Sequence, residues 1–262
     1  MAAVVIELKN VNWKYPSFSG KESNFQMKNI NLQIYKNEFF GITGSTGSGK
    51  STLCQLISGI IPHQIKVPDG KIEDYFSGEV IVLGKTISKI EKGENGYVLV
   101  GEKNAAPDLG LVMQDPESQF LTMSALTEIT LGMRIMGLSK EEMENRIKES
   151  LELVGLGDLY PVLDKLHPSE LSGGQKQRLI LASFLAMRPK ILILDEPTSD
   201  LDSLGKMEII EAIKNVKEKG DITVILVEHD PEILMKFTDR LAVLYNGEIV
   251  MLDTPEKIFS DE

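Results

Sequence analysis

The segment from Gly44 to Ser51 has the residue types and spacing of a phosphate-binding loop. It reads GSTGSGKS and follows the apolar run EFFGIT, so a strand, a loop and a helix are expected in that order. Its glycines let the backbone curl so that successive N–H groups point at phosphate oxygens. Lys50 supplies a charge for the outer phosphates, and the Ser51 hydroxyl is a ligand for Mg²⁺. The nucleotide-binding residues predicted here are Gly44, Ser45, Thr46, Gly47, Ser48, Gly49, Lys50, Ser51 and Thr52.

The alternative for this segment is a flexible glycine loop without a ligand, which the flanking pattern disfavours. Leu53, Leu56, Ile57 and Ile60 recur at helical spacing directly after the loop. The single cysteine, Cys54, cannot form an internal disulfide and is expected to pack within this helix.

Two adjacent carboxylates supply the remaining chemistry that a triphosphate site needs. The residues from Ile191 to Leu194 are typical of a strand buried on both faces, and Asp195 and Glu196 follow at its carboxyl end, where open α/β sheets place ligands. Asp195 is predicted to hold Mg²⁺, and Glu196 to orient or deprotonate an attacking water. The alternative is an acidic turn that merely leads into Pro197.

The segment LSGGQ predicts a second helix start that could bind an anion. Ser172 can cap the helix that begins here, while Gly173 and Gly174 leave its first N–H groups open. Because one loop already cradles this chain's nucleotide, a second such helix end suggests a nucleotide held by another subunit. The segment resembles the signature of the ATP-binding-cassette (ABC) ATPases, in which two cassettes sandwich two ATP molecules head to tail. The resemblance implies a role across the subunits for Leu171, Ser172, Gly173, Gly174 and Gln175.

The resemblance extends to other motifs of that family, which follow in the family's order. It implies that Gln114 reaches Mg²⁺ and the attacking water, and that His229 contacts the γ-phosphate of ATP. It also implies that Tyr15 stacks on adenine, with Trp13 as a less favoured substitute and core packing as the alternative.

The loop after Glu196 both matches the family and departs from it. Asp202 matches the acidic position of the family's D-loop. Asp200 stands where relatives usually carry a small residue, and this difference concerns the detailed contacts across the subunits.

Within the ABC class, the chain resembles the ATPase component of energy-coupling factor (ECF) importers, which take up vitamins or transition-metal ions. Pro116, Glu117 and Gln119 reproduce the Q-P-acid-x-Q pattern of those relatives. The resemblance implies as partners a second cassette, identical or paralogous, a coupling transmembrane protein and a substrate-binding membrane protein, at the cytoplasmic face of a prokaryotic cell membrane. It places the transmembrane contact at Asp115 and Glu117, where the alternative is a solvated loop.

Other functions remain as alternatives. An ATPase subunit of another ABC importer or exporter has the same motifs and would differ in the membrane protein that co-purifies with it. A soluble ABC protein of DNA repair or chromosome organisation is less well supported, because the interval from Lys50 to Asp195 leaves no room for coiled-coil arms. A GTPase would need an N/T-K-x-D segment, and the sequence contains none.

Composition agrees with a soluble, intracellular ATPase. The 262 residues can bury a substantial core, and no apolar run approaches the length of about 18 residues that a membrane span needs. The first residues lack a basic region followed by an apolar core, so no secretory signal is expected. A net charge of −11 disfavours a nucleic-acid partner.

The predicted fold class is α/β: a P-loop NTPase with a RecA-like parallel sheet, an antiparallel β subdomain and an α-helical subdomain. A single ABC ATPase domain is expected over 1–262, with 1–113 and 188–262 in the nucleotide-binding core and 114–187 in the helical subdomain. Central strands are expected at 38–43, 109–113, 191–194 and 222–228. Antiparallel strands are expected within 1–35 and near 79–83 and 97–101.

Three further expectations concern the remaining segments. The stretches around 62–78 and 89–108, the second hairpin-like, are expected to be surface elaborations. Met143, Ile147, Leu151 and Val154 mark one apolar face of a helix in the helical subdomain. A strand, a turn, a strand and a brief helix are expected near the C-terminus.

Overall fold

The computed structural model describes residues 2–17, 25–94, 96–102, 108–115, 117–199, 201–219 and 222–260. Contacts divide the chain into two compact units. Unit 1 comprises Met1–Ala106 and Thr238–Glu262, and unit 2 comprises Pro107–Phe237. Among the helices of the described residues, none is long and apolar enough to span a lipid bilayer.

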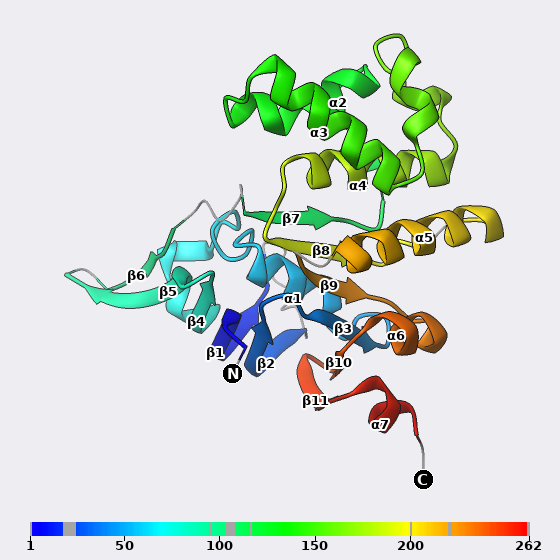
Figure 1. The fold of residues 1–262 in the computed structure, drawn as a ribbon. Helices are drawn as coiled ribbons and strands as arrows, with labels where there is room; N and C mark the ends of the chain where they lie inside the picture. The colour runs from blue at the N-terminus through cyan, green and yellow to red at the C-terminus, as the bar shows by residue number, and fades with distance from the viewer. Residues whose placement is uncertain are drawn as a thin grey trace. The chain divides into compact units, whose positions relative to one another are not determined.

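Unit 1 contains a five-stranded antiparallel sheet in the order β2-β1-β4-β5-β6 (Figure 1). Its strands are β1 Val4–Lys14, β2 Gln26–Tyr35, β4 Phe76–Val82, β5 Lys85–Gly93 and β6 Gly96–Val100. One face is buried because apolar residues alternate with polar ones, as at Ile30, Leu32 and Ile34 of β2. The predicted antiparallel strands are confirmed, and the predicted hairpin is the β5–β6 pair.

A second group of strands in unit 1 frames the glycine-rich loop. Strand β3 (Phe39–Gly44) pairs in parallel with β10 (Arg240–Tyr245), and β10 pairs in antiparallel fashion with β11 (Glu248–Asp253). Asn246 and Gly247 connect β10 to β11 with φ values of 48° and 79°, the positive values that a type I′ hairpin turn requires. Helices α1 (Lys50–Ile57) and α7 (Pro255–Phe259) follow β3 and β11, as the sequence predicts, but α1 ends before Ile60, the last residue of the predicted helical pattern.

The stretch around 62–78 is not purely a surface elaboration, and that prediction is wrong in part. It contains two short 3-10 turns, η1 (Pro68–Gly70) and η2 (Ile72–Asp74), before it enters β4. The side chains of Ile72 and Phe76 are buried and belong to the core of unit 1. Apolar residues at irregular spacing give no periodic pattern, so the sequence did not indicate this burial.

Unit 2 is built on three parallel strands in the order β7-β8-β9. They are β7 Leu109–Val112, β8 Ile191–Asp195 and β9 Thr223–Val227. Every residue of β8 and β9 is buried, as expected of strands covered on both faces.

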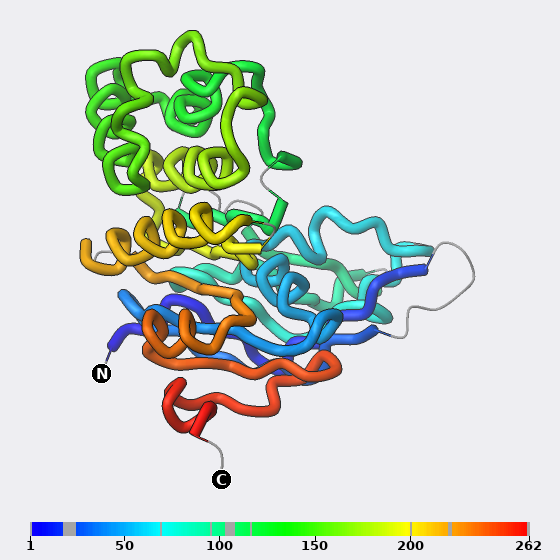
Figure 2. The backbone as a smooth tube through the Cα atoms, turned by 90° about the vertical axis from the view of Figure 1, so that its right-hand side faces the viewer, coloured from blue at the N-terminus to red at the C-terminus, as the bar shows by residue number. Residues whose placement is uncertain are grey.

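The helices of unit 2 include a compact group of α2, α3 and α4 (Figure 2), in which α4 contacts both other helices and also β7. The α-helices are α2 Ala125–Ile135, α3 Lys140–Leu153, α4 Gly173–Ala186, α5 Ser203–Lys219 and α6 Pro231–Phe237. Short 3-10 turns are η3 Glu117–Gln119, η4 Gly157–Val162 and η5 Pro168–Glu170. Ile147 and Leu151 are buried on α3 and Met143 is half-buried, which confirms the predicted apolar face; Val154 is also buried but is the C-cap residue after the helix.

Candidate functional site

The glycine-rich loop of unit 1 depends on backbone conformations that favour glycine. Gly44, Gly47 and Gly49 have φ values of 146°, 79° and 109°. A Cβ atom on Gly44 would come within 2.2 Å of the Leu244 carbonyl oxygen, because β3 and β10 are paired at that position. The loop therefore combines positive φ with a close backbone approach, and both exclude a side chain at Gly44.

The loop leads into a helix whose N-terminus has no side-chain cap. Gly49 occupies the N-cap position of α1 and provides no side-chain hydrogen bond to the first turn. Such N–H groups, with the positive end of the helix dipole, attract an anion. The Lys50 ammonium group is buried beside them and donates to the carbonyl oxygens of Gly44 at 3.1 Å and Ser45 at 3.4 Å. The arrangement suits a phosphate group.

A hairpin far along the sequence braces the same loop. The backbone N–H of Gly247 donates to the Ser48 carbonyl oxygen at 3.0 Å, and the Gly247 carbonyl accepts from Lys28 N at 2.8 Å. A Cβ atom on Gly247 would lie 1.9 Å from the Gln26 carbonyl oxygen. Sequence reasoning identified this turn but not its target, because the contact depends on the pairing of β3 with β10.

Tyr15 lies beside the helix that follows the loop. Its hydroxyl is 3.2 Å from Thr52 Oγ1 and 3.4 Å from Gln55 Oε1. Trp13 packs edge-on against Tyr15 but is fully buried, so its ring offers no face to a base, and its role as a substitute is wrong. The ring centroids of Phe25 and Tyr15 are 6.4 Å apart, and Phe25 also lies next to Gly49. Sequence reasoning did not identify Phe25.

The two carboxylates of unit 2 lie at the carboxyl end of β8, as the sequence predicts. Asp195 is the last residue of β8 and is buried. Glu196 has φ 52°, a left-handed conformation that is rare for residues with a side chain and costs on the order of 1–3 kcal/mol. The surroundings stabilise it: Glu196 N donates to Val227 O at 3.1 Å, and Glu196 O accepts from the Ser199 hydroxyl at 2.8 Å.

The structure brings His229 and Glu196 into direct contact. His229 follows β9 by two residues, and its Nε2 atom lies 2.8 Å from Glu196 Oε1. The neighbouring residue Glu228 is a buried carboxylate that hydrogen-bonds both to the backbone N–H of His229 and to Thr198. Sequence reasoning missed Glu228 and Thr198, because they lie in separate loops and belong to no motif with a recognisable spacing.

The segment after β7 holds Gln114 at an exposed position. Gln119 folds back on the strand end: its Oε1 accepts from Met113 N at 2.8 Å and its Nε2 donates to Leu111 O at 3.1 Å. Asp115 Oδ1 accepts from Glu117 N at 2.9 Å, and the Glu117 carboxylate pairs with Lys176 of α4. Both acidic groups of the predicted docking site thus have partners within unit 2. Pro116 lies outside the described residues.

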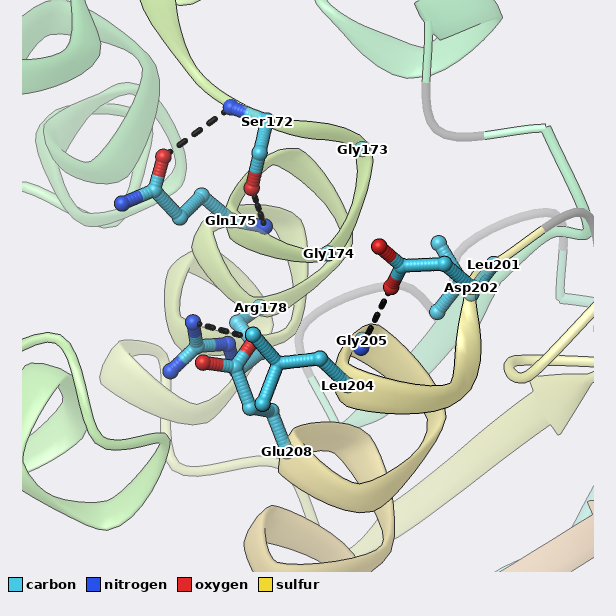
Figure 3. A pocket seen from close by; sticks show the side chains of 10 residues that line it. All are labelled: Ser172, Gly173, Gly174, Gln175, Arg178, Leu201, Asp202, Leu204, Gly205 and Glu208. Carbon is cyan, nitrogen blue, oxygen red and sulfur yellow. Dashed lines mark hydrogen bonds and ion pairs between the residues drawn. The ribbon is translucent and has the colours of Figure 1, made fainter.

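The LSGGQ segment forms a reciprocal capping box at the start of α4 (Figure 3). Ser172 Oγ accepts from Gln175 N at 3.2 Å, and Gln175 Oε1 accepts from Ser172 N at 2.9 Å. The predicted cap at Ser172 is therefore present. Gly173 and Gly174 lie between these two residues, and Leu171 is buried directly before them.

A hollow of about 510 Å³ lies between the start of α4 and the start of α5 (Figure 3). Asp202 caps α5 by accepting from Gly205 N at 2.7 Å. A Cβ atom on Gly174 would come 3.1 Å from Gly205 Cα, so the two helices approach closely. One wall is the ion pair of Arg178 and Glu208 at 2.8 Å, and burial lowers the pKa of the Arg178 guanidinium. Asp200 lies outside the described residues.

Three of the predicted residues offer oxygen ligands of the kind that Mg²⁺ prefers. Val112 of β7 is opposite Leu194 of β8, so Gln114, two residues after β7, and Asp195, the last residue of β8, lie at the carboxyl ends of neighbouring parallel strands. Ser51 is exposed on the first turn of α1 in unit 1. By chemical type, these side chains fit a magnesium ion.

Comparison with known proteins gives consistent matches. A model of the ABC transporter family matches residues 27–199. A putative ABC transporter ATP-binding protein of Pyrococcus abyssi is 38% identical to this chain, with 98% of this chain and 83% of the relative aligned. The energy-coupling factor transporter ATP-binding protein EcfA2 of Caldanaerobacter subterraneus is also 38% identical, with 98% and 81% aligned. The solved structure of CbiO1 from Clostridium perfringens, described as part of the ABC transporter complex CbiONQ, matches with a TM-score of 0.76 and 28% identity. That match covers 99% of this chain and 92% of CbiO1.

Proposed function

Because this chain belongs to the ABC transporter family, we propose that it binds and hydrolyses ATP as a subunit of an ECF-type importer for a vitamin or a transition-metal ion. The proposal rests on two features, one suited to binding phosphate and the other to activating water. Unit 1 has an uncapped helix start behind a glycine loop, and unit 2 has a carboxylate in contact with an imidazole. Relatives named as ECF transporter ATP-binding proteins support the importer class.

The glycine loop binds the triphosphate of ATP. Backbone N–H groups at the start of α1 and the Lys50 ammonium group hold the phosphate oxygens, and Tyr15 stacks on the adenine. Ser51, Asp195 and Gln114 hold Mg²⁺, which neutralises charge on the phosphates when it is bound. Lys50 and Ser51 begin α1, Asp195 ends β8, and Tyr15 and Gln114 follow β1 and β7 within two residues.

The unit 2 residues act on the attacking water. Glu196 accepts a proton from that water while the water oxygen attacks the γ-phosphorus. The bond between the γ-phosphorus and the oxygen that leaves with ADP then breaks. His229 contacts the γ-phosphate and, through its contact with Glu196, keeps the carboxylate in one orientation. The left-handed backbone at Glu196 supports this role, because strained residues gather at functional sites.

A second cassette, either another copy or a paralogue, completes each site. The signature residues of one chain, from Leu171 to Gln175, approach the γ-phosphate bound to the other chain, and Asp202 lies beside that contact. The coupling transmembrane protein docks at the segment with Asp115 and Glu117, and a separate membrane protein captures the substrate. The complex works at the cytoplasmic face of the membrane.

The test uses Glu196→Gln in the full chain, with Glu211→Gln on the exposed surface of α5 as the matched control. We expect turnover of ATP to fall by about 10²- to 10⁴-fold in Glu196→Gln, because the base is lost, while nucleotide affinity stays nearly unchanged. Light scattering should then detect paired cassettes with ATP and Mg²⁺ and single chains with ADP. The Glu211→Gln protein should behave like the wild type.

Two results would contradict the proposal. Wild-type turnover in Glu196→Gln would show that Glu196 is not the base. The same molecular mass without nucleotide, with ADP and with ATP would show that the cassettes do not pair. Co-purification of the tagged chain with its membrane partners identifies the transporter class. An exporter subunit found there would favour the alternative.

A further inference from the structure

Glu228 is a buried carboxylate that the proposed mechanism does not use. Its residue is 5% exposed, and it stands between the end of β9 and His229. Carboxylates are rarely buried unless hydrogen bonds or charges compensate for the lost hydration. Its partners therefore indicate what it does.

Both carboxylate oxygens of Glu228 have hydrogen-bond donors. Oε2 accepts from His229 N at 2.7 Å and, at a longer 3.5 Å, from Asp230 N. Oε1 accepts from the hydroxyl of Thr198, which is itself buried. Thr198 follows Glu196 by two residues, so the two oxygens join the loops that carry Glu196 and His229.

The backbone ladder alone does not explain how these loops meet. Asp195 is opposite Val227 in the β8–β9 register, and Glu196 N donates to Val227 O at 3.1 Å. Beyond that point, the side-chain bonds Thr198–Glu228 and Glu196–His229 connect the loops. They tie Glu196, which has the left-handed conformation, and Thr198, two residues later, to the two residues that follow β9.

We propose that Glu228 and Thr198 are positioning residues for ATP hydrolysis, which fix the His229 loop against the Glu196 loop. This inference rests on the proposed function, in which Glu196 and His229 act on the water and the γ-phosphate. Glu228 acts through His229 and not as a base, because its oxygens are occupied and its side chain is buried. Loss of the link lets the imidazole move away from Glu196.

The test removes the hydroxyl with little change of shape, in Thr198→Val, and restores it in Thr198→Ser. We expect Thr198→Val to lower kcat by roughly 10-fold, with KM for ATP within about twofold of the wild type, because misplacing a reacting group slows the chemical step and leaves the binding residues intact. Thr198→Ser should recover most of the activity. Thr130→Val is the matched control, since Thr130 is also buried but donates to Leu126 O within α2.

A spectroscopic readout separates positioning from general loss of stability. The chain has three histidines, so histidine labelled with ¹⁵N gives few NMR signals, and His229→Ala assigns the one of interest. We expect Thr198→Val and Glu228→Gln to shift the imidazole signal of His229 but not those of His63 and His167.

The outcomes distinguish this inference from the proposed function. Unchanged kcat in Thr198→Val, or an unchanged His229 signal, would overturn the positioning role while the effect of Glu196→Gln still stands. A wild-type chain that hydrolyses no ATP would instead overturn the proposed function, and the NMR shift would still report the structural link. If Thr130→Val lowered kcat as much as Thr198→Val, the loss would be one of packing and the inference would fail.

Discussion

The two helix starts that the sequence marks for anion binding are built in opposite ways. Helix α1 begins after Gly49 with no side-chain cap, whereas α4 begins with a complete capping box between Ser172 and Gln175. At α1, the N-cap residue therefore supplies no side-chain acceptor to the first turn. At α4, the N–H of Gln175 is already bonded to Ser172 Oγ.

In the proposed function, α1 binds the phosphates of this chain's own nucleotide and α4 completes the site of another subunit, and the two helix starts differ accordingly. The first turn of an uncapped helix is stabilised by the phosphate that it binds. In the free chain, the hydrogen bond from Gly247 to Ser48 supports the loop before α1. A capped end is stable by itself and offers the remaining donors of Gly173 and Gly174. Such an end suits contact with a phosphate that another subunit holds and releases.

The largest expected effect comes from filling the loop before α1, with Gly44→Ala. The added methyl would meet the Leu244 carbonyl oxygen at 2.2 Å, and backbone in a paired strand cannot move aside cheaply. We expect a lower melting temperature and nucleotide affinity reduced at least about 10-fold, since strain of on the order of 1–3 kcal/mol adds to the clash. Calorimetry and nucleotide titration measure both quantities.

The control for this change is Gly84→Ala. Gly84 also has positive φ, at 77°, but a Cβ atom there meets nothing within 4 Å, so it carries the left-handed strain without the clash. Nucleotide affinity should stay unchanged in Gly84→Ala. If the two variants lost affinity equally, the close approach to Leu244 would not explain the need for glycine.

The sequence could predict features that depend on residues close together in the chain. The glycine loop before α1 and the cap of α4 are features of this kind. The glycines of the loop and the cap at Ser172 each depend on residues a few positions apart, so spacing alone identifies them. The alternation in β2 and the buried run of β8 likewise predicted their strands.

The contacts that hold the loops in place were not predictable in this way. The bond from Gly247 to Ser48, the link from Glu228 to Thr198 and the ion pair of Lys176 with Glu117 join distant segments. Each depends on strand order or helix packing, which periodicity does not determine. The burial of Phe76 within a stretch expected at the surface has the same cause.

A smaller effect is expected when the cap of α4 is removed in Ser172→Ala. Loss of an N-cap costs about 1 kcal/mol in the free energy of unfolding, measured by denaturant titration. Because the start of α4 is proposed to meet the partner's nucleotide, ATP-driven pairing of the cassettes should also weaken, measured by light scattering in the Glu196→Gln background.

Ser139→Ala supplies the matched control for the cap. Ser139 caps α3 in the same way, accepting from Glu142 N at 3.2 Å, but it lies away from the signature segment in the sequence. Its loss should cost similar stability and leave pairing unchanged. Equal loss of pairing in both variants would mean that helix stability, and not the position of Ser172, controls assembly.

The smallest effect on stability is expected at the ion pair that ties α4 to the segment after Gln114. Lys176 lies in the first turn of α4, and the Glu117 side chain, its partner, is 69% exposed, so breaking the pair should cost no more than about 1 kcal/mol. Substitution of either residue of the pair would affect docking differently. Glu117→Gln removes a charge that a basic group of the coupling transmembrane protein could bind, whereas Lys176→Met releases that charge from its internal partner.

Co-purification with the membrane subunits therefore separates the two roles of Glu117. If Glu117 receives a partner's cation, Glu117→Gln should reduce assembly, while Lys176→Met should preserve or increase it. Lys85→Met, in the exposed pair with Glu102 on unit 1, is the control for loss of a surface charge. Equal loss of assembly in Glu117→Gln and Lys176→Met would mean that the internal pair itself is needed, because it would then shape the segment beside Gln114 for its partner. Undiminished assembly in both variants would leave Glu117 without a docking role. The ion pair with Lys176 would then only tie the segment after Gln114 to the first turn of α4.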